Sequence, residues 1–238
     1  SGPCHGGSSA SNRTVMNVHE LSSKHLTDYV QDGFTLVSGL MGDSIATAAE
    51  SAMWSCMKAR PDDPDTWPDS FAEGVDHPDI IACYTDAFLQ VAAQLGGESS
   101  ARFEAPGGAL AINIFPTEEP WQPPGPHIDH AIKEHGHRTF PRPFRVATMT
   151  FLDDVEYHCG GTAVWPGSHQ AIERLARSDE ERYGFMWTLN QDLHRAEVGD
   201  PVILTPRRGD VLFYDALCAH GGSANTGSRP RLALNHKW

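Results

Sequence analysis

Two short segments that lie far apart in the chain place the strongest constraint on its fold. The first is Pro126-His127-Ile128-Asp129-His130, and the second runs from His220 to Arg231. In an extended strand the side chains of residues i and i+2 point to the same face, so His127 and Asp129 can direct an imidazole and a carboxylate to one point. A fold that brings His220 to the same point would complete a set of two histidines and one carboxylate.

This set of side chains predicts a metal site. Two histidines and one carboxylate on one side of a metal leave the opposite positions open, which suits non-haem Fe(II) that must bind further ligands. The sequence therefore predicts that His127, Asp129 and His220 are the metal ligands and the catalytic centre. A zinc hydrolase is an alternative interpretation, because the same ligand set also suits zinc.

Arg231 begins a run in which apolar and polar residues alternate. In a strand, Leu232 and Leu234 would share one face, and Arg231, Ala233 and Asn235 the other. An arginine on an inward face needs a partner, because an unpaired buried guanidinium is costly, and its planar fork fits a carboxylate. A metal triad with a recessed arginine is what 2-oxoglutarate requires: the keto-acid end chelates iron, and the arginine holds the far carboxylate.

Four motifs in a fixed order carry a resemblance to a known family. They are His127-Ile128-Asp129, GGTAVWPGSH at 160–169, GDVLF at 209–213 and the interval from His220 to Arg231; YVQDGF at 29–34 supports them. In these motifs the chain resembles the phytanoyl-CoA dioxygenase-like family of Fe(II)/2-oxoglutarate oxygenases. One position departs from the family pattern. The second residue after the distal histidine is often serine in the family, but it is Gly222 here, with Ser223 next.

The resemblance implies a reaction and a set of cofactors. It implies Fe(II), with 2-oxoglutarate and O₂ as cosubstrates, and hydroxylation of an unactivated C–H bond of a small molecule with release of succinate and CO₂. Halogenating relatives replace the carboxylate ligand to make room for chloride, so Asp129 favours hydroxylation. Desaturation and cyclisation stay open on the same site. Arg231 would bind the cosubstrate, and we expect Asn113, Met149 and Thr150 near it.

A basic segment, residues 133–145, directly follows the first ligand pair in an otherwise acidic protein. We interpret it as a lid in which Arg138 or Arg142 meets an anionic part of the substrate. The alternative is a solvated loop. Trp187 is a further candidate for the wall of the substrate pocket, with a place in the core as its alternative.

The order of predicted elements indicates the fold class. Helices are predicted at 24–31, 43–58 and 78–95, and strands at 34–37, 110–115, 144–152, 162–165, 202–204, 211–214 and 231–237. Helices followed by short strands predict an α+β, mainly β fold: a double-stranded β-helix (jelly-roll or cupin-like) core with supporting N-terminal helices. Residues 1–14 are predicted to be a flexible tail or a remnant of cloning, and residues 15–238 a single domain.

Composition excludes some classes of partner. The formal charge of −13 argues against nucleic-acid and membrane-surface binding, and no apolar run is long enough to span a membrane. Five scattered cysteines without a CxxC motif favour a reducing compartment, and hence a cytoplasmic location. Two further alternatives stay open: a cupin-type metal enzyme that does not use 2-oxoglutarate, and a non-catalytic binding protein on the same fold. The sequence predicts neither the substrate nor the oligomeric state.

Overall fold

The computed structural model describes residues 21–97 and 103–238, so the predicted N-terminal tail lies outside the described residues. Helices dominate the first half of this part, and strands the second half. The helices are α1 (Ser23–Asp32), α2 (Asp43–Met57), η1 (Pro64–Thr66), α3 (Pro78–Ile81), α4 (Asp86–Leu95), α5 (Ser168–Ser178), α6 (Met186–Gln191) and η3 (Leu193–Arg195). The strands are β1 (Phe34–Val37), β2 (Gly74–Val75), β3 (Ala109–Ala111), β4 (Ala147–Phe151), β5 (Thr162–Val164), β6 (Val202–Ile203), β7 (Val211–Tyr214), β8 (His220–Gly222) and β9 (Ala233–Lys237).

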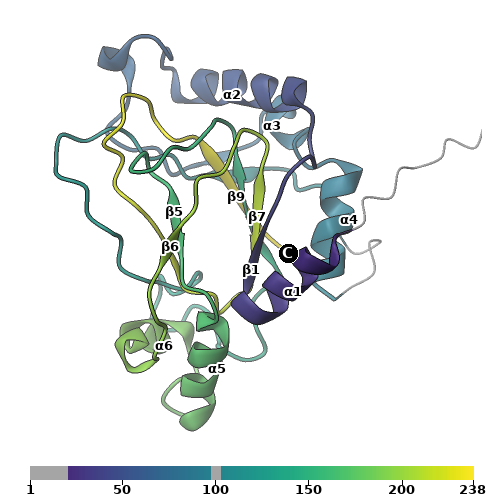
Figure 1. Cartoon of the computed structure of the whole chain (residues 1–238), viewed down its shortest axis with the longest axis vertical. Coiled ribbons are helices and arrows are strands. Elements are labelled where there is room, and N and C mark those ends of the chain that lie inside the picture. The colour runs from purple at the N-terminus through teal and green to yellow at the C-terminus, as the bar shows by residue number, and fades with distance from the viewer. Residues whose placement is uncertain (1–20, 98–102) are drawn as a thin grey trace, which may run out of the picture.

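Two antiparallel sheets form the centre of the molecule (Figure 1). The larger sheet has the order β1-β7-β4-β9-β3-β2, and the smaller one has the order β6-β5-β8. In the larger sheet, Thr150 of β4 lies opposite Val211 of β7 and Leu234 of β9. Val164 of the smaller sheet packs with Met149 in one apolar cluster. The structure confirms the predicted α+β class and is consistent with a double-stranded β-helix.

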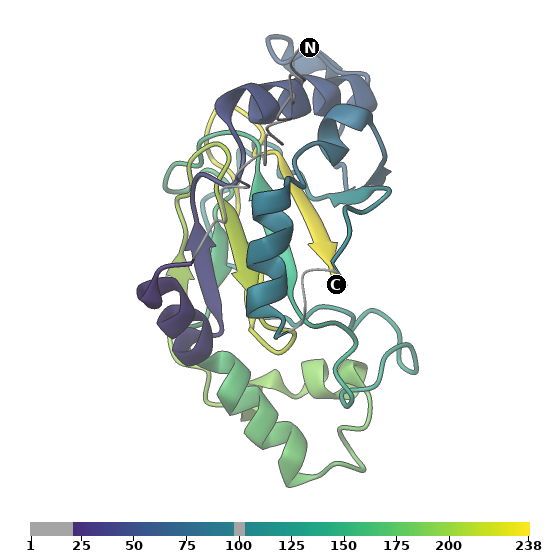
Figure 2. The same cartoon turned by 90° about the vertical axis from the view of Figure 1, so that its right-hand side faces the viewer.

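The two faces of the larger sheet bury different groups. Ala147, Met149 and Phe151 of β4 belong to the cluster between the sheets, and alternation turns Thr148 and Thr150 the other way. That other face packs on the helices, and α4 lies across it (Figure 2). Figure 1 shows α2 at one end of the molecule and α5 with α6 at the opposite end. Helix α4 therefore covers the outer face of the larger sheet, and the space between the two sheets is left to the site.

The predicted helix 78–95 is two helices, α3 and α4, so the prediction of one continuous helix was wrong. Thr85 separates them. Its hydroxyl accepts a hydrogen bond from the Phe88 N–H (3.2 Å), as an N-cap does, and donates one to the Leu40 carbonyl (2.6 Å). The Thr85 contact with Leu40 and the N-cap at Thr85 break the helix here, although the apolar stripe continues through both helices.

The junction between α1 and β1 explains two of the sequence motifs together. Gly33 ends α1 with a positive φ of 83°, and a Cβ there would lie 2.5 Å from Nδ1 of His169. His169 is buried, and its Nε2 lies 3.2 Å from the Val30 carbonyl oxygen. The motif at 160–169 thus ends in a residue that packs on the motif at 29–34, and a side chain at position 33 would prevent this contact.

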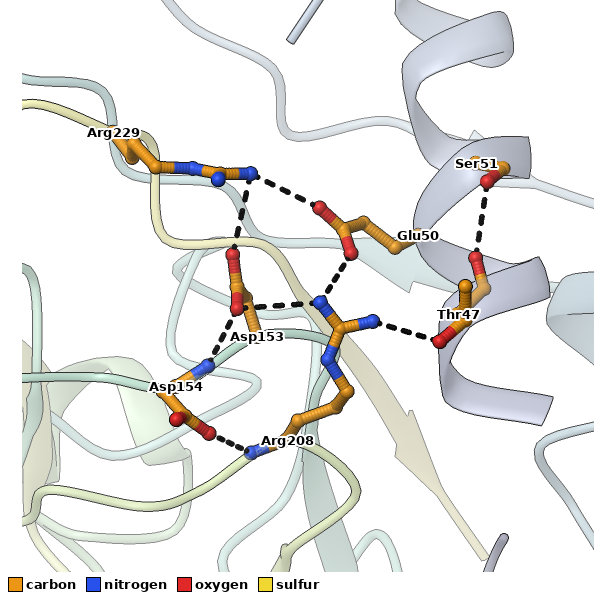
Figure 3. A network of polar contacts seen from close by, with 7 residues as sticks. All are labelled: Thr47, Glu50, Ser51, Asp153, Asp154, Arg208 and Arg229. Atoms are coloured by element: carbon orange, nitrogen blue, oxygen red, sulfur yellow. Dashed lines mark hydrogen bonds and ion pairs between the residues drawn. The ribbon is translucent and has the colours of Figure 1, made fainter. Parts of the chain in front are cut away.

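A network of charged side chains joins α2 to the loops at that end of the sheets (Figure 3). The Glu50 carboxylate accepts hydrogen bonds from Arg208 (2.6 Å) and from Arg229 (3.2 Å). Asp153 pairs with the same two guanidinium groups, at 3.4 Å and 3.5 Å. Arg229 lies only two residues before Arg231, so the network also holds the loop that leads into the predicted cosubstrate residue.

We expect the substitution Glu50→Gln to lower the free energy of unfolding by about 1–3 kcal/mol, since it removes one charged partner from two guanidinium groups. Urea unfolding followed by circular dichroism would measure this change. The matched control is Asp28→Asn, because the Lys24–Asp28 pair joins neighbouring turns of α1 and its lysine is 79% exposed. Equal stability loss in the two variants would show that the network does not hold α2.

Candidate metal centre

The fold brings His127, Asp129 and His220 together. His127 extends the smaller sheet by pairing with His220 of β8, through two backbone hydrogen bonds of 3.0 Å. One candidate ligand atom from each of the three side chains lies within 4.8 Å of the others. His220 Nε2 is 3.5 Å from an oxygen of Asp129. In the part of the chain that the structure describes, no other group of this kind is close enough to hold a metal.

Neighbouring groups favour the protonation states of the three candidate ligands that metal binding requires. Burial acts to raise the pKa of Asp129, but His220, Lys237 and Tyr214 outweigh it and hold that pKa well below its usual value. Desolvation by the surrounding groups, followed by the neighbouring His220, lowers the pKa of His127 to about 4 although the residue is partly open to solvent, so its ring is neutral at neutral pH. Nδ1 of His220 lies 3.0 Å from the Cys218 carbonyl oxygen, and a proton shared there leaves Nε2 free for the metal.

A buried hydrogen-bond chain positions the Asp129 carboxylate. The hydroxyl of Tyr214 donates to Asp129 Oδ2 (2.8 Å), and the amide of Asn235 donates to the same hydroxyl (2.9 Å). The Asn235 amide also donates to the Thr148 carbonyl (2.9 Å), so neighbouring strands fix its position. The aspartate is thereby oriented through β7 and β9, and these partners would act on a bound metal through this carboxylate.

We expect Tyr214→Phe to weaken Fe(II) binding by about 10- to 100-fold, because the substitution removes only the hydroxyl that orients Asp129. Anaerobic titration of the metal-free protein would measure the dissociation constant. Tyr183→Phe is the control, since Tyr183 is also buried but its hydroxyl contacts Asp192 (3.0 Å), which is not a member of the triad. Unchanged affinity in Tyr214→Phe would show that the carboxylate needs no such support.

A cavity of about 110 Å³ opens beside the triad. Its lining is the triad together with Leu110, Ile112, Met149, Thr162, Tyr214, Gly221, Gly222, Arg231, Asn235 and Lys237. Arg231 is only 4% exposed, and its Nε and Nη1 have no hydrogen-bond partner among the described residues. Burial lowers the pKa of Arg231 to about 10, so the group is still charged at neutral pH.

The unpaired guanidinium fits a missing ligand. A buried cation without a partner is costly, and its fork matches a carboxylate. The Thr162 hydroxyl is also buried without a partner and lines the same cavity. The residues therefore fit a bound carboxylate at one end and a metal at the triad, as 2-oxoglutarate and Fe(II) would require.

The other predicted cosubstrate contacts divide between the two sheet faces. Met149 lines the cavity, as predicted. Asn113 does not line it: its amide points to Met57 Sδ (3.4 Å), and its oxygen accepts from the Ala233 N–H (3.2 Å). Thr150 follows Met149 on β4 and so points to the helix face instead. The structure thus gives the predicted roles of Asn113 and Thr150 no support, because both side chains lie on the helix side of the sheet.

At Gly222, where the family pattern often has serine, a side chain would meet Ile114 and the Arg231 guanidinium. A Cβ at this position would lie 2.8 Å from Cδ1 of Ile114 and 3.9 Å from Nη2 of Arg231. Ser223 does not replace the usual serine in the cavity, because it is buried and its hydroxyl donates to the Gly161 carbonyl (2.7 Å). The space beside the Arg231 guanidinium is therefore left open.

The three predicted substrate residues do not line the cavity. Arg142 is held by ion pairs with Asp215 and with Glu173 (2.7 Å), so its charge is already matched. Arg138 is exposed and lies over the Phe185 ring, 5.2 Å from its centroid. Trp187 is half-buried on α6. The structure gives the predicted substrate role of Arg142 no support, because two internal carboxylates already pair with its guanidinium.

Sequence reasoning missed three residues of the site: Thr162, Tyr214 and Lys237. A signal for two of them was present. Lys237 continues the alternation that places Arg231 and Asn235 on one face, and Thr162 opens a strand directly after two glycines. Tyr214 carried no such signal, because only the pairing of β4, β7 and β9 places it beside Asp129.

Comparisons with known proteins agree with this geometry. The model of the family described as phytanoyl-CoA dioxygenase (PhyH) matches residues 29–233. No curated protein is significantly similar to the chain in sequence. Within the described residues, no helix has the length and apolarity needed to cross a membrane.

Solved structures share the fold at low sequence identity. The carbocyclase SnoK from nogalamycin biosynthesis is 19% identical, with a TM-score of 0.62 over 90% of this chain and 82% of SnoK. EctD from S. alaskensis, solved with 2-oxoglutarate and 5-hydroxyectoine, is 17% identical, with a TM-score of 0.59 over 93% and 77%. EvdO2 from Micromonospora carbonacea var. aurantiaca, complexed with 2-oxoglutarate, is 16% identical, with a TM-score of 0.57 over 92% and 90%.

Proposed function

The chain belongs to the phytanoyl-CoA dioxygenase family, and from this premise we propose that it is a non-haem Fe(II)- and 2-oxoglutarate-dependent dioxygenase that hydroxylates an unactivated C–H bond of a small molecule. Family membership and the triad confirm the predicted class of oxygenase and its iron and 2-oxoglutarate. Hydroxylation and the choice of substrate are the parts that we propose.

The main support for the proposal is a buried, charged arginine that shares a cavity with the metal triad. Its Nε and Nη1 have no hydrogen-bond partner among the described residues. Arg231 is not needed for metal binding, and its isolation in the core costs stability unless a ligand anion meets it. A cupin-type enzyme without 2-oxoglutarate, a zinc hydrolase and a binding protein all leave this arginine unexplained.

Each residue then has a task in the reaction. His127, Asp129 and His220 would hold the metal on one side, and Arg231 with Thr162 would hold the far carboxylate of 2-oxoglutarate. Bound iron with its cosubstrate supplies the oxidation: O₂ and 2-oxoglutarate are consumed, succinate and CO₂ are released, and one oxygen atom enters the substrate C–H bond. Leu110, Ile112 and Met149 form apolar walls of the cavity and restrict the access of water.

Asp129 argues against halogenation among the outcomes that a site of this kind permits. The carboxylate is present, oriented by Tyr214 and held ionised, so it occupies the position that a halogenating relative would give to chloride. The structures of similar fold include a carbocyclase and an epimerase. Cyclisation and epimerisation are therefore the rival outcomes, and product analysis decides between them and hydroxylation.

The test is an anaerobic titration with Fe(II) followed by 2-oxoglutarate. We expect a weak visible absorption band from the iron–keto-acid chelate. With O₂ admitted and a substrate found by screening, we expect one succinate per product and a product heavier by one oxygen atom. Bound iron without the band would contradict the proposal and favour the cupin-type enzyme. A product of unchanged mass, or lighter by two hydrogen atoms, would retain the oxygenase class and refute hydroxylation.

A further inference from the structure

Lys237 places a second positive charge in the cavity, and neither the metal nor the cosubstrate accounts for it. It lines the cavity together with Asn235 of β9 and with Arg231, which lies two residues before β9 begins. Five residues lie between Arg231 and Lys237, and six steps of extended chain place their Cα atoms about 20 Å apart. The two cations therefore enter the site from opposite ends of the segment that contains β9.

The charges of the loaded site would balance without Lys237. A divalent iron ion, the Asp129 carboxylate, doubly charged 2-oxoglutarate and the Arg231 guanidinium together carry no net charge. The ammonium of Lys237 is an added positive charge, and its side chain is only 16% exposed. Asp129 is the one ion-pair partner of Lys237 in the described part of the chain, and a bound metal would be coordinated by that carboxylate.

The present contacts of Lys237 leave hydrogen-bonding capacity unused. An ammonium has three donors. One N–H of Lys237 donates a hydrogen bond to the side-chain oxygen of Asn235. The Lys237 nitrogen lies 3.4 Å from Asp129 Oδ2, which is long for a hydrogen bond. That oxygen already accepts from Tyr214 at 2.8 Å. The aspartate is thus satisfied without Lys237, which still has a donor to offer the cavity.

The neighbouring imidazole does not share this charge. Burial, followed by the charge on Lys237, lowers the pKa of His236 to about 4, so that ring is neutral at neutral pH. A single ammonium next to apolar walls balances one negative charge. This favours a carboxylate over a doubly charged phosphate as its partner.

We propose that Lys237 binds a carboxylate of the substrate at the end of the cavity away from Arg231. This inference rests on the proposed function, and it names the class of substrate: a small carboxylic acid whose reacting carbon lies near its acid group. Lys237 then decides which molecules are held beside the metal, while Arg231 serves the cosubstrate.

The experiment compares acids with amides of the same carbon skeleton. The probes are benzoate and benzamide, phenylacetate and phenylacetamide, and hexanoate and hexanamide, with phenyl phosphate as the phosphate probe. Anaerobic protein loaded with Fe(II) and 2-oxoglutarate is titrated with each probe, and the change in the chelate band is followed. Thermal stabilisation of zinc-loaded protein by the same probes gives a second readout that does not depend on the band.

We expect the acids to bind and the amides not to bind. Lys237→Met should weaken acid binding by about tenfold or more, and Lys237→Arg should restore most of it, because a charged hydrogen bond is lost in one variant and kept in the other. Fe(II) affinity should stay the same or rise in Lys237→Met, since a positive charge beside the ion is removed.

Several results would overturn this inference. They are equal binding of acids and amides, no binding of any acid to the wild type, and unchanged acid binding in Lys237→Met. Weaker Fe(II) binding in Lys237→Met would show that the lysine supports Asp129 instead, and Lys237-dependent preference for phenyl phosphate would refute the carboxylate. Loss of the chelate band in the wild type would refute the proposed function alone, because the zinc-loaded protein still reports on Lys237.

Discussion

Arg231→Met should raise the 2-oxoglutarate concentration for half-saturation by about 100-fold or more, while the protein still binds Fe(II). Breaking a buried charge pair costs about 3–5 kcal/mol, and each 1.4 kcal/mol is about tenfold in affinity. Methionine keeps much of the apolar stem, and it removes a cation that the folded protein leaves unpaired. Isothermal titration of the anaerobic Fe(II) protein with 2-oxoglutarate would measure the change.

The control for this variant is Arg174→Met, since Arg174 lies exposed on α5 and does not line the cavity. Unaltered 2-oxoglutarate affinity in Arg231→Met would contradict the proposed role of the arginine. It would then favour the cupin-type enzyme, which needs no such residue.

Asp129→Asn should weaken Fe(II) binding by more than about 100-fold, which is the upper end of the effect expected from a residue that merely orients a ligand. The amide keeps the shape of the side chain but loses the charge that its surroundings hold ionised. In the wild type, Fe(II) at 100 times its dissociation constant should add about 2.7 kcal/mol to the free energy of unfolding. The variant should show less than about 0.4 kcal/mol of this stabilisation at the same concentration.

The adjacent residue offers a control for this second variant. His130 packs against His137, with ring centroids 4.2 Å apart, and it is not a member of the metal group. His130→Gln should therefore keep its Fe(II) affinity. Metal-dependent stabilisation that survives in Asp129→Asn would show that the aspartate is not a ligand.

Local periodicity explains why the triad and Arg231 were predictable from the sequence. Side chains at i and i+2 share a face of an extended strand, and on this basis Arg231 was correctly placed with Asn235. His127 and Asp129 also lie together, although Asp129 is in a turn. The same rule exposes one error. Met149 and Thr150 are neighbours on β4, and adjacent strand residues cannot both face the cosubstrate.

The sequence by itself predicted the group of three candidate metal ligands, the buried arginine beside it and the class of fold, because each prediction depends on short-range spacing or on the order of motifs. Only the tertiary structure decided which face of each strand meets the cavity, since both faces of β4 are buried and alternation does not distinguish them. It also decided that Asp215 and Glu173 form ion pairs with Arg142. It further placed Tyr214 in hydrogen-bond contact with Asp129 and Lys237 3.4 Å from the same carboxylate. These partners lie far apart in the chain, and strand pairing and tertiary packing alone bring their charges into contact.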